Sequence, residues 1–272
     1  MFRGIKGDDR NLSVKIDNQL LKIEDFLAAN NLKLNISKTQ ILRTASRQQH
    51  AGNKKENIVL KAKNDKDEYI VPANCAKILG VIFNKTLIWK DFIEIGNEAM
   101  VGKLKRKLGA LKFASKFSTY KTRLKLANGC IMSIITYGIQ VWGLHCKASV
   151  LSKVQSVQLN TLKWVTGKYY GSLRQLLEET GWLSVYKLAI YHSVLLFWKV
   201  KWKGKPERLL RRMRMAEDTV ARLLITERIW SRTAERFFRK VEHLLAGIQR
   251  ISEAKNVLRK WIKTNVPLSE EN

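Results

Sequence analysis

The side chains most able to do chemistry in this chain are its lysines and arginines. The 272-residue sequence has 51 of them against 23 aspartates and glutamates, which gives a formal net charge of +28. From Ala99 to Leu177 there is no acidic residue, but there are 14 basic ones. A solvated surface normally mixes both signs. A stretch of this length without acids therefore predicts a polyanionic partner, nucleic acid first and an anionic membrane second.

Nine of these cations fall on two neighbouring helices that the hydrophobic spacing predicts between residues 91 and 138. They are the candidate nucleic-acid contacts, and they would meet phosphates without reading base sequence: Lys103, Lys105, Arg106, Lys107, Lys112, Lys116, Lys121, Arg123 and Lys125. A second basic cluster, Arg208 to Arg214, is equally well explained as a solvated face. Tryptophan and lysine interleave from Trp198 to Lys203, which would suit stacking on unpaired bases, although core tryptophans are the commoner case.

Paired aspartates would indicate phosphoryl-transfer chemistry, because that reaction uses two metal ions held by clustered carboxylates. Gly7-Asp8-Asp9 is the paired candidate in the sequence. Its flanking residues do not form two apolar strands. Asp8 and Asp9 are therefore expected at the start of the first helix, as a cap or as first-turn acids.

Cysteine and histidine give no site by themselves. Cys75, Cys130 and Cys146 are scattered, which predicts reduced, buried thiols and no disulfide framework. His145 adjoins Cys146, but a metal site needs three or four ligands and the sequence offers no further ones nearby. No metal site is predicted.

The elements that carry these residues change character near residue 86. Before it we expect a helix over 13–29 with one apolar face (Ile16, Leu20, Ile23 and Leu27), an alternating strand at Leu32–Ile36, a hairpin of 57–63 with 68–71, and a strand at Ala76–Phe83. Gly80 within that last strand suggests a close backbone approach.

After residue 86 the spacing predicts helices throughout. They are expected at 91–115, 119–138 (capped by Thr119), 149–166 (ended by Gly167), 172–180, 184–202, 206–215, 227–252 and 254–266. The most apolar window, Leu183–Trp202, contains charged residues and is not a convincing membrane span. No signal peptide is visible, so we expect a nuclear or cytoplasmic protein.

Four short motifs follow one another between residues 20 and 167. Leu32–Thr39 (LKLNISKT) follows a helix, and Leu79-Gly80-Val81 is followed by Trp89 and a helix. Ser133–Trp142 (SIITYGIQVW) comes next, and then the helix Leu151–Gly167. In this order they resemble the palm end and thumb of reverse transcriptases from non-LTR (LINE-like) retrotransposons, which carry Leu-x-Leu-Asn-x-x-Lys-Thr, a Leu-Gly strand and Ser-x-x-x-Tyr-Gly-x-x-x-Trp.

The resemblance implies roles for particular residues. Lys38 falls where these polymerases carry a lysine thought to protonate the departing pyrophosphate, a sound use of a cation beside a leaving phosphate. Leu79-Gly80 falls on the primer grip, where the backbone approaches the primer 3′ end. The spacing from Asp9 to Lys38 is too short for the family's catalytic aromatic-x-Asp-Asp turn, which we therefore expect upstream of Met1. The complete parent enzyme would use Mg²⁺, whereas no cofactor is expected in this chain.

The expected fold is α+β and mostly helical. A palm remnant would occupy residues 1–86, thumb helices 87–146, and a helical C-terminal extension 147–272. The expected function is that of an RNA-directed DNA polymerase fragment. It would bind a template/primer duplex of RNA and DNA but lack the catalytic aspartates, so its partners would include the parent's N-terminal palm and fingers.

Two other functions stay open. One is a non-catalytic basic nucleic-acid-binding module, and the weaker one is a membrane-surface helix around Leu183–Trp202. A polymerase fragment should leave a broken, exposed edge on its palm remnant, whereas a self-contained binding module should not.

Overall fold

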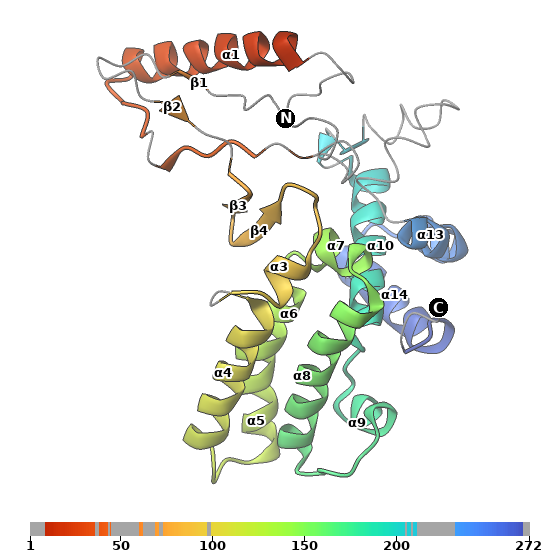
Figure 1. Cartoon of the computed structure of the whole chain (residues 1–272). Coiled ribbons are helices and arrows are strands. Elements are labelled where there is room, and N and C mark those ends of the chain that lie inside the picture. Colours follow the sequence, from red (N-terminus) through yellow and green to blue (C-terminus); the bar gives the residue numbers. More distant parts are fainter. Residues whose placement is uncertain are drawn as a thin grey trace. The chain divides into compact units, whose positions relative to one another are not determined.

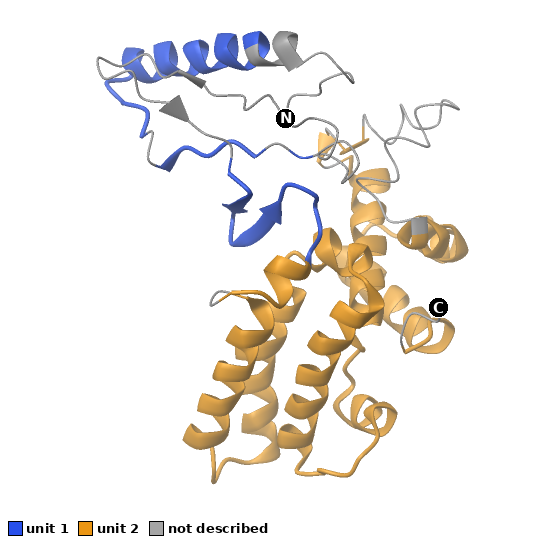
Figure 2. Cartoon of the chain, viewed as in Figure 1, with its two compact units in different colours: residues 1–89 blue, residues 90–272 orange. Residues whose placement is uncertain are grey.

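The chain divides into two compact units, residues 1–89 and residues 90–272 (Figure 2). The computed structural model describes residues 9–35, 38–42, 44, 60–61, 69–70, 73–96, 99–204, 206–207, 209–210 and 232–268. Helices dominate, and the strands form two antiparallel pairs, β1–β2 and β3–β4. The fold is therefore α+β and mostly helical, as the sequence predicts. The structure does not test the division into palm remnant, thumb and extension, which stays a prediction. Residues 90–272, which contain the predicted thumb and extension, form a single unit.

In the first unit, helix α1 runs from Asp9 to Ala29 (Figure 1). Its first residue is one of the two paired aspartates, which agrees with a place at the helix start, whereas Asp8 lies outside the described residues. The helix ends at Asn30 and Asn31. The Asn30 side chain donates to the Phe26 carbonyl, and Asn31 has a positive φ of 54°.

The apolar face predicted for α1 is only partly buried. Leu20 is buried, but Ile23 is exposed, and so are Val14, Leu21 and Phe26. The 3.6-residue period thus predicts the helix correctly, but it does not predict how much of the face is covered.

The strand predicted at Leu32–Ile36 is wrong for residues 32–35, which have no regular secondary structure, and Ile36 lies outside the described residues. Asn35 instead starts a turn. Its side-chain Oδ1 accepts from the Lys38 N–H (3.1 Å), and its carbonyl accepts from the Thr39 hydroxyl (2.8 Å). Asn offers its own backbone such a local bond and so competes with strand pairing.

The predicted hairpin of 57–63 with 68–71 is observed as β1 (Leu60–Lys61) paired with β2 (Tyr69–Ile70). Its outer residues lie outside the described part of the chain.

The single strand predicted at Ala76–Phe83 is also wrong. It is a hairpin of β3 (Cys75–Ile78) and β4 (Val81–Asn84), with Ile78 opposite Val81. Leu79 and Gly80 form the two-residue turn, and both have positive φ (48° and 82°), as type I′ hairpin turns require. A leucine rarely adopts this conformation, so Leu79 gave no indication of a turn in the sequence.

The second unit opens with α3 (Lys90–Ile93) and α4 (Met100–Ala114). One helix was predicted over 91–115, but Gly96, with φ of 90°, interrupts it. Next come α5 (Tyr120–Ala127), the π-helical turn η2 (Asn128–Met132) and α6 (Ser133–Thr136), in place of the helix predicted over 119–138. The predicted cap is confirmed, since the Thr119 hydroxyl accepts from the Thr122 N–H.

The motif at 133–142 has a clear structural purpose. Gly138 adopts a left-handed φ of 61° and ends α6 before α7 (Ile139–Trp142) and η3 (Gly143–His145). The fully buried Trp142 donates its indole N–H to the Tyr137 carbonyl (3.0 Å). Trp142 therefore donates a hydrogen bond to a carbonyl at the end of α6 while its ring fills the core.

Helices α8 (Ala148–Thr166) and α10 (Val185–Lys203) form the centre of this unit, with the short α9 (Leu173–Thr180) between them. Their predicted ends are confirmed: Gly167 and Gly181 have positive φ, and Ser172 and Ser184 cap the following helices. Two glutamines join α8 to α10. Gln155 accepts from the Val185 N–H, and the buried Gln158 donates to the Leu183 carbonyl.

The chain ends with α13 (Arg232–Leu245) and α14 (Ile251–Asn265), both packed on α10. A single helix over 227–252 was predicted, but Gly247, with φ of 79°, separates the two. Leu245 is buried at the end of α13, whereas Leu244 and Ile251 are exposed. No helix among the described residues is long and apolar enough to cross a membrane.

Candidate nucleic-acid interface

Helix α4 separates its apolar and basic residues cleanly. Leu104 and Leu108 are buried in the bundle. Lys105 and Lys112 are exposed, and their separation of seven residues places them on one stripe of the helix. Gly109 lies between them on that stripe, and a Cβ atom there would meet nothing within 4 Å. The stripe thus combines two ammonium groups with room for a close approach, and Lys116 is exposed just beyond the end of the helix.

The other cations of α4 lie around the same helix. Lys103 and Lys107 are one turn apart on the opposite flank, where Lys103 is half-buried and Lys107 exposed. Arg106 is exposed on the side away from Leu104. Cations therefore surround the solvent-facing half of α4.

Helix α5 divides its three cations between two roles. Lys121 and Lys125, one turn apart, are exposed. Arg123 is turned inward, and its Nη1 donates to the carbonyl of Trp164 on α8 (2.8 Å). That bond ties the start of α5 to the end of α8. The guanidinium thus has a partner inside the protein, whereas the contact predicted between Arg123 and nucleic acid stays untested.

The third helix of the bundle, α8, packs against both α4 and α5. No acid lies anywhere in residues 99–177, and three acids near the two ends of this segment have cationic partners. Glu94 pairs with Lys153 (2.6 Å), Glu179 with Lys168 (2.8 Å), and Glu178 with Arg174 (3.6 Å). The segment that forms α4, α5 and α8 therefore carries a clear excess of positive charge, as a phosphate-binding surface requires.

Lys38 and Leu79-Gly80 belong to the first unit, whereas the nine cations belong to the second. The Lys38 side chain is exposed and its backbone is held in the Asn35 turn. Leu79, at the tip of the β3–β4 hairpin, is 84% exposed. An exposed leucine held at positive φ is unfavourable both for the backbone and for solvation, a combination found more often at functional positions than elsewhere.

The interleaved tryptophans are part of the core. Trp198 is fully buried, and Trp202 packs on Phe238 of α13 at 5.7 Å between ring centres. Lys201, between them, pairs with Glu242. Stacking on bases is therefore not available to Trp198. The second basic cluster, from Arg208 to Arg214, lies outside the described residues.

Cys146 and His145 lie in surroundings that disfavour their charged forms. Burial, together with the charge of Glu94, raises the pKa of Cys146 to about 12, and burial lowers the pKa of His145. A protonated thiol is a poor nucleophile and a poor metal ligand. Cys75 was predicted to be buried but is exposed, because it lies on β3, an edge strand. Within the described part of the chain no three His, Cys, Asp or Glu residues gather into a possible metal site.

Sequence reasoning missed one group of residues. Phe113 and Phe117 are exposed at the end of α4, and Tyr169 and Tyr170 are exposed just after α8. The signal was present for the first pair, because Phe113 lies nine residues after Leu104 and therefore on the opposite side of the helix. The tyrosines carried no such signal, since they lie in a connection without periodicity.

Comparisons of the chain with protein-family models, curated proteins and solved structures found no match. The resemblance to LINE-like reverse transcriptases therefore rests on the four motifs alone.

Proposed function

We propose that this chain binds nucleic acid through the cationic bundle α4–α5–α8, as part of an RNA-directed DNA polymerase of the non-LTR retrotransposon kind. The observation that carries the binding is the acid-free segment 99–177. It buries core residues such as Leu104 and Leu108 and leaves lysines exposed on all three helices. Such a surface attracts the backbone phosphates of RNA and DNA with little regard to base sequence.

The polymerase part of the proposal is supported by the motif order and by the first unit. Helix α1 exposes Val14, Leu21, Ile23 and Phe26. Exposed apolar side chains of this size suit a palm piece that normally packs against further parts of an enzyme. In that setting Lys38 would sit near the departing pyrophosphate, and the Leu79-Gly80 turn would approach the primer 3′ end.

A second candidate is a self-contained nucleic-acid-binding module. It is favoured by the second unit, in which residues 90–272 form a compact body with their own buried core, including Trp142 and Trp198. Such a module would need neither a catalytic site nor a polymerase partner.

Salt dependence tests the binding that both candidates share. The probe is a fluorescently labelled RNA–DNA hybrid, titrated with the chain at increasing salt. If six or more phosphates are contacted, the affinity should fall about a thousandfold or more between about 50 and 200 mM salt. A flat salt response would contradict the proposal.

Two experiments separate the candidates. Primer extension on an RNA template with Mg²⁺ or Mn²⁺ should give no product, because the sequence lacks the clustered aspartates that hold the metals. Templated extension would overturn the expectation that this chain lacks a catalytic site. The DNA upstream of the Met1 codon should encode an in-frame aromatic-x-Asp-Asp. Unrelated sequence there would favour the self-contained module.

A further inference from the structure

Four large aromatic side chains are exposed in two connections of the cationic bundle. Phe113 and Phe117, around the end of α4, are 90% and 93% exposed. Tyr169, between α8 and α9, is mostly exposed, and Tyr170 is fully exposed. We name these four residues the aromatic end. Single exposed apolar residues are ordinary, but four large rings together are not explained by the folding of the bundle.

The two connections lie at the same end of the bundle. Residues 115–119 join α4 to α5, and residues 167–172 join α8 to α9. The hydrogen bond from Arg123 to the Trp164 carbonyl fixes the start of α5 beside the end of α8. Figure 1 shows both connections at the lower end of α4, α5 and α8.

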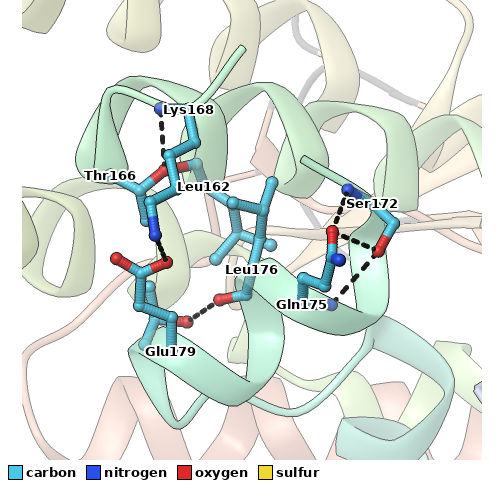
Figure 3. Close-up of polar contacts among 8 residues, drawn as sticks. Leu162, Thr166, Lys168, Ser172, Gln175, Leu176 and Glu179 are labelled. Carbon is cyan, nitrogen blue, oxygen red and sulfur yellow. Dashed lines mark hydrogen bonds and ion pairs between the residues drawn. The ribbon is translucent and has the colours of Figure 1, made fainter. Parts of the chain in front are cut away.

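Tyr169 and Tyr170 lie in a turn that hydrogen bonds hold on both sides, and Figure 3 shows the residues that make these bonds. The Lys168 N–H donates to the Thr166 hydroxyl (3.2 Å), and its ammonium pairs with Glu179 on α9 (2.8 Å). On the other side, Ser172 and Gln175 form a reciprocal capping box. Gly171 packs so closely on Leu176 that a Cβ atom would come within 2.9 Å of it. Because these contacts hold the chain on both sides of the tyrosines, the backbone of this turn should lose little freedom when the rings bind a ligand.

The other connection is held by hydroxyl groups. The Ser118 hydroxyl donates to the Ser115 carbonyl (2.7 Å), and Thr119 caps α5. Phe117 lies between these bonded residues, and the Lys116 ammonium lies 5.7 Å from its ring centre.

Cations accompany the rings. Lysines close to them along the chain, at the ends of α4, α5 and α8 or in the two connections, are Lys112, Lys116, Lys121, Lys163 and Lys168. No acid lies between residues 99 and 177. A purely apolar partner protein would not call for this charge, whereas a strand of nucleic acid needs both features, since its bases stack on rings and its phosphates meet ammonium groups.

We infer that the aromatic end binds unpaired nucleotides by stacking their bases on Phe113, Phe117, Tyr169 and Tyr170. The inference rests on the proposed nucleic-acid binding and refines it. In a duplex the bases already stack on each other, so exposed rings add nothing to duplex binding. They favour a single-stranded segment, such as unpaired template that continues from a duplex held along α4 and α5.

The test compares two oligonucleotides of equal length and equal phosphate number. One is oligo(dT), and the other carries abasic sites in place of the thymines. The full-length protein should bind oligo(dT) more tightly than the abasic oligonucleotide. Phe117→Ala and Tyr170→Ala should each weaken oligo(dT) binding about tenfold where the ring carries a base, and should leave binding of the abasic chain and of a blunt duplex unchanged.

Three variants serve as controls. Tyr170→Phe and Phe117→Tyr keep a ring and should retain the preference for oligo(dT). Phe26→Ala removes an exposed aromatic from α1, outside the aromatic end, and should change none of the affinities. A 2-aminopurine in the oligonucleotide reports stacking directly, because its fluorescence should be quenched by the natural chain and less so by the two alanine variants.

The outcomes are distinguishable. If the duplex binds with a steep salt dependence but the alanine variants keep the full preference for oligo(dT), the inference is wrong and the proposed function stands. If no nucleic acid binds, both fail. If the alanine variants lose binding to vesicles of anionic lipid while oligo(dT) binding is unchanged, the aromatic end is a membrane contact and the inference is overturned.

Discussion

Arg123 and Lys125 are two positions apart on the same helix and carry the same charge, yet the structure gives them different surroundings. The Arg123 guanidinium donates to the Trp164 carbonyl inside the bundle, whereas Lys125 is exposed. A hydrogen bond from a charged donor to a partly buried carbonyl contributes about 1.5–3 kcal/mol to stability. An exposed lysine contributes almost nothing to stability, but each phosphate contact adds to the salt dependence of binding.

The two residues therefore form a matched pair of variants. Arg123→Gln should lower the free energy of unfolding by about 1–3 kcal/mol and leave the salt slope of duplex binding unchanged. Lys125→Gln should do the opposite, with unchanged stability and a slope reduced by about one. Urea denaturation and salt titrations of both variants check this. An equal loss of salt slope in both variants would show that Arg123 contacts phosphates as well.

At the residue scale the sequence predicted which residue types face a polyanion but not which way each one points. All nine cations belong to α4, α5 or the connection between them, as expected. The inward turn of Arg123 depends on the position of the Trp164 carbonyl, 41 residues away. Such a long-range partner leaves no local pattern. The exposure of Tyr169 and Tyr170 had no local signal either, because the two residues lie in a connection without periodicity.

At the element scale, helix ends were predicted better than strands. Thr119, Ser172 and Ser184 cap helices, and Gly167 ends one, because capping depends on residues only a few positions apart. The β3–β4 hairpin was missed since Leu79 occupies a turn position that normally takes Asn, Asp or Gly.

Two glycines test how closely the helices pack. A Cβ atom on Gly143 would lie 2.7 Å from the Ala189 Cβ and 2.9 Å from Ile139 Cγ1. Gly143→Ala should therefore destabilise the protein by about 1–3 kcal/mol. Gly109→Ala, inside α4 with open space around it, should stabilise it by about 0.5–1 kcal/mol. Thermal unfolding of both variants should show shifts of opposite sign, and a gain for Gly143→Ala would contradict the close contact between η3 and α10.

Helix α10 also carries a group that should make stability depend on pH. Burial, with smaller contributions from Lys255 on α14 and Lys199 on α10, lowers the pKa of His192 from 6.5 to about 4. The folded state therefore binds a proton less readily than the unfolded state. The contribution of the neutral His192 to the free energy of unfolding is therefore complete above about pH 6.5 and is lost as the pH falls toward 4.

Each unit of pKa difference corresponds to about 1.4 kcal/mol, so His192 should account for about 2–3 kcal/mol of the stability lost between pH 7.5 and 4.5. Urea midpoints of the natural chain and of His192→Gln at both pH values check this. The variant should lose less stability on acidification. An equal loss in both would show that other groups, such as the paired carboxylates, cause the whole effect.

At the scale of the whole molecule, the sequence predicted a change of character near residue 86, and the structure divides the chain between Trp89 and Lys90. Composition shows such a change because an alternating, loop-rich segment gives way to helical periodicity. What composition could not give is the internal grouping of the second part. Helix α8, predicted to begin a separate extension, packs on α4 and α5, since its apolar face needs both.

This grouping predicts where binding resides. Residues 90–272 expressed alone should fold cooperatively, because their buried side chains, Trp142, Trp198 and Leu258 among them, lie within one compact unit. All nine candidate cations are in this segment. It should therefore bind a blunt RNA–DNA hybrid with the same salt slope as the full chain.

Preference for a recessed primer end over a blunt end should need the full chain, because Lys38 and Leu79-Gly80 lie in residues 1–89. A segment that keeps the primer-end preference would remove the role proposed for the first unit, and one with a much smaller slope would show that cations of residues 1–89 also contact the phosphates.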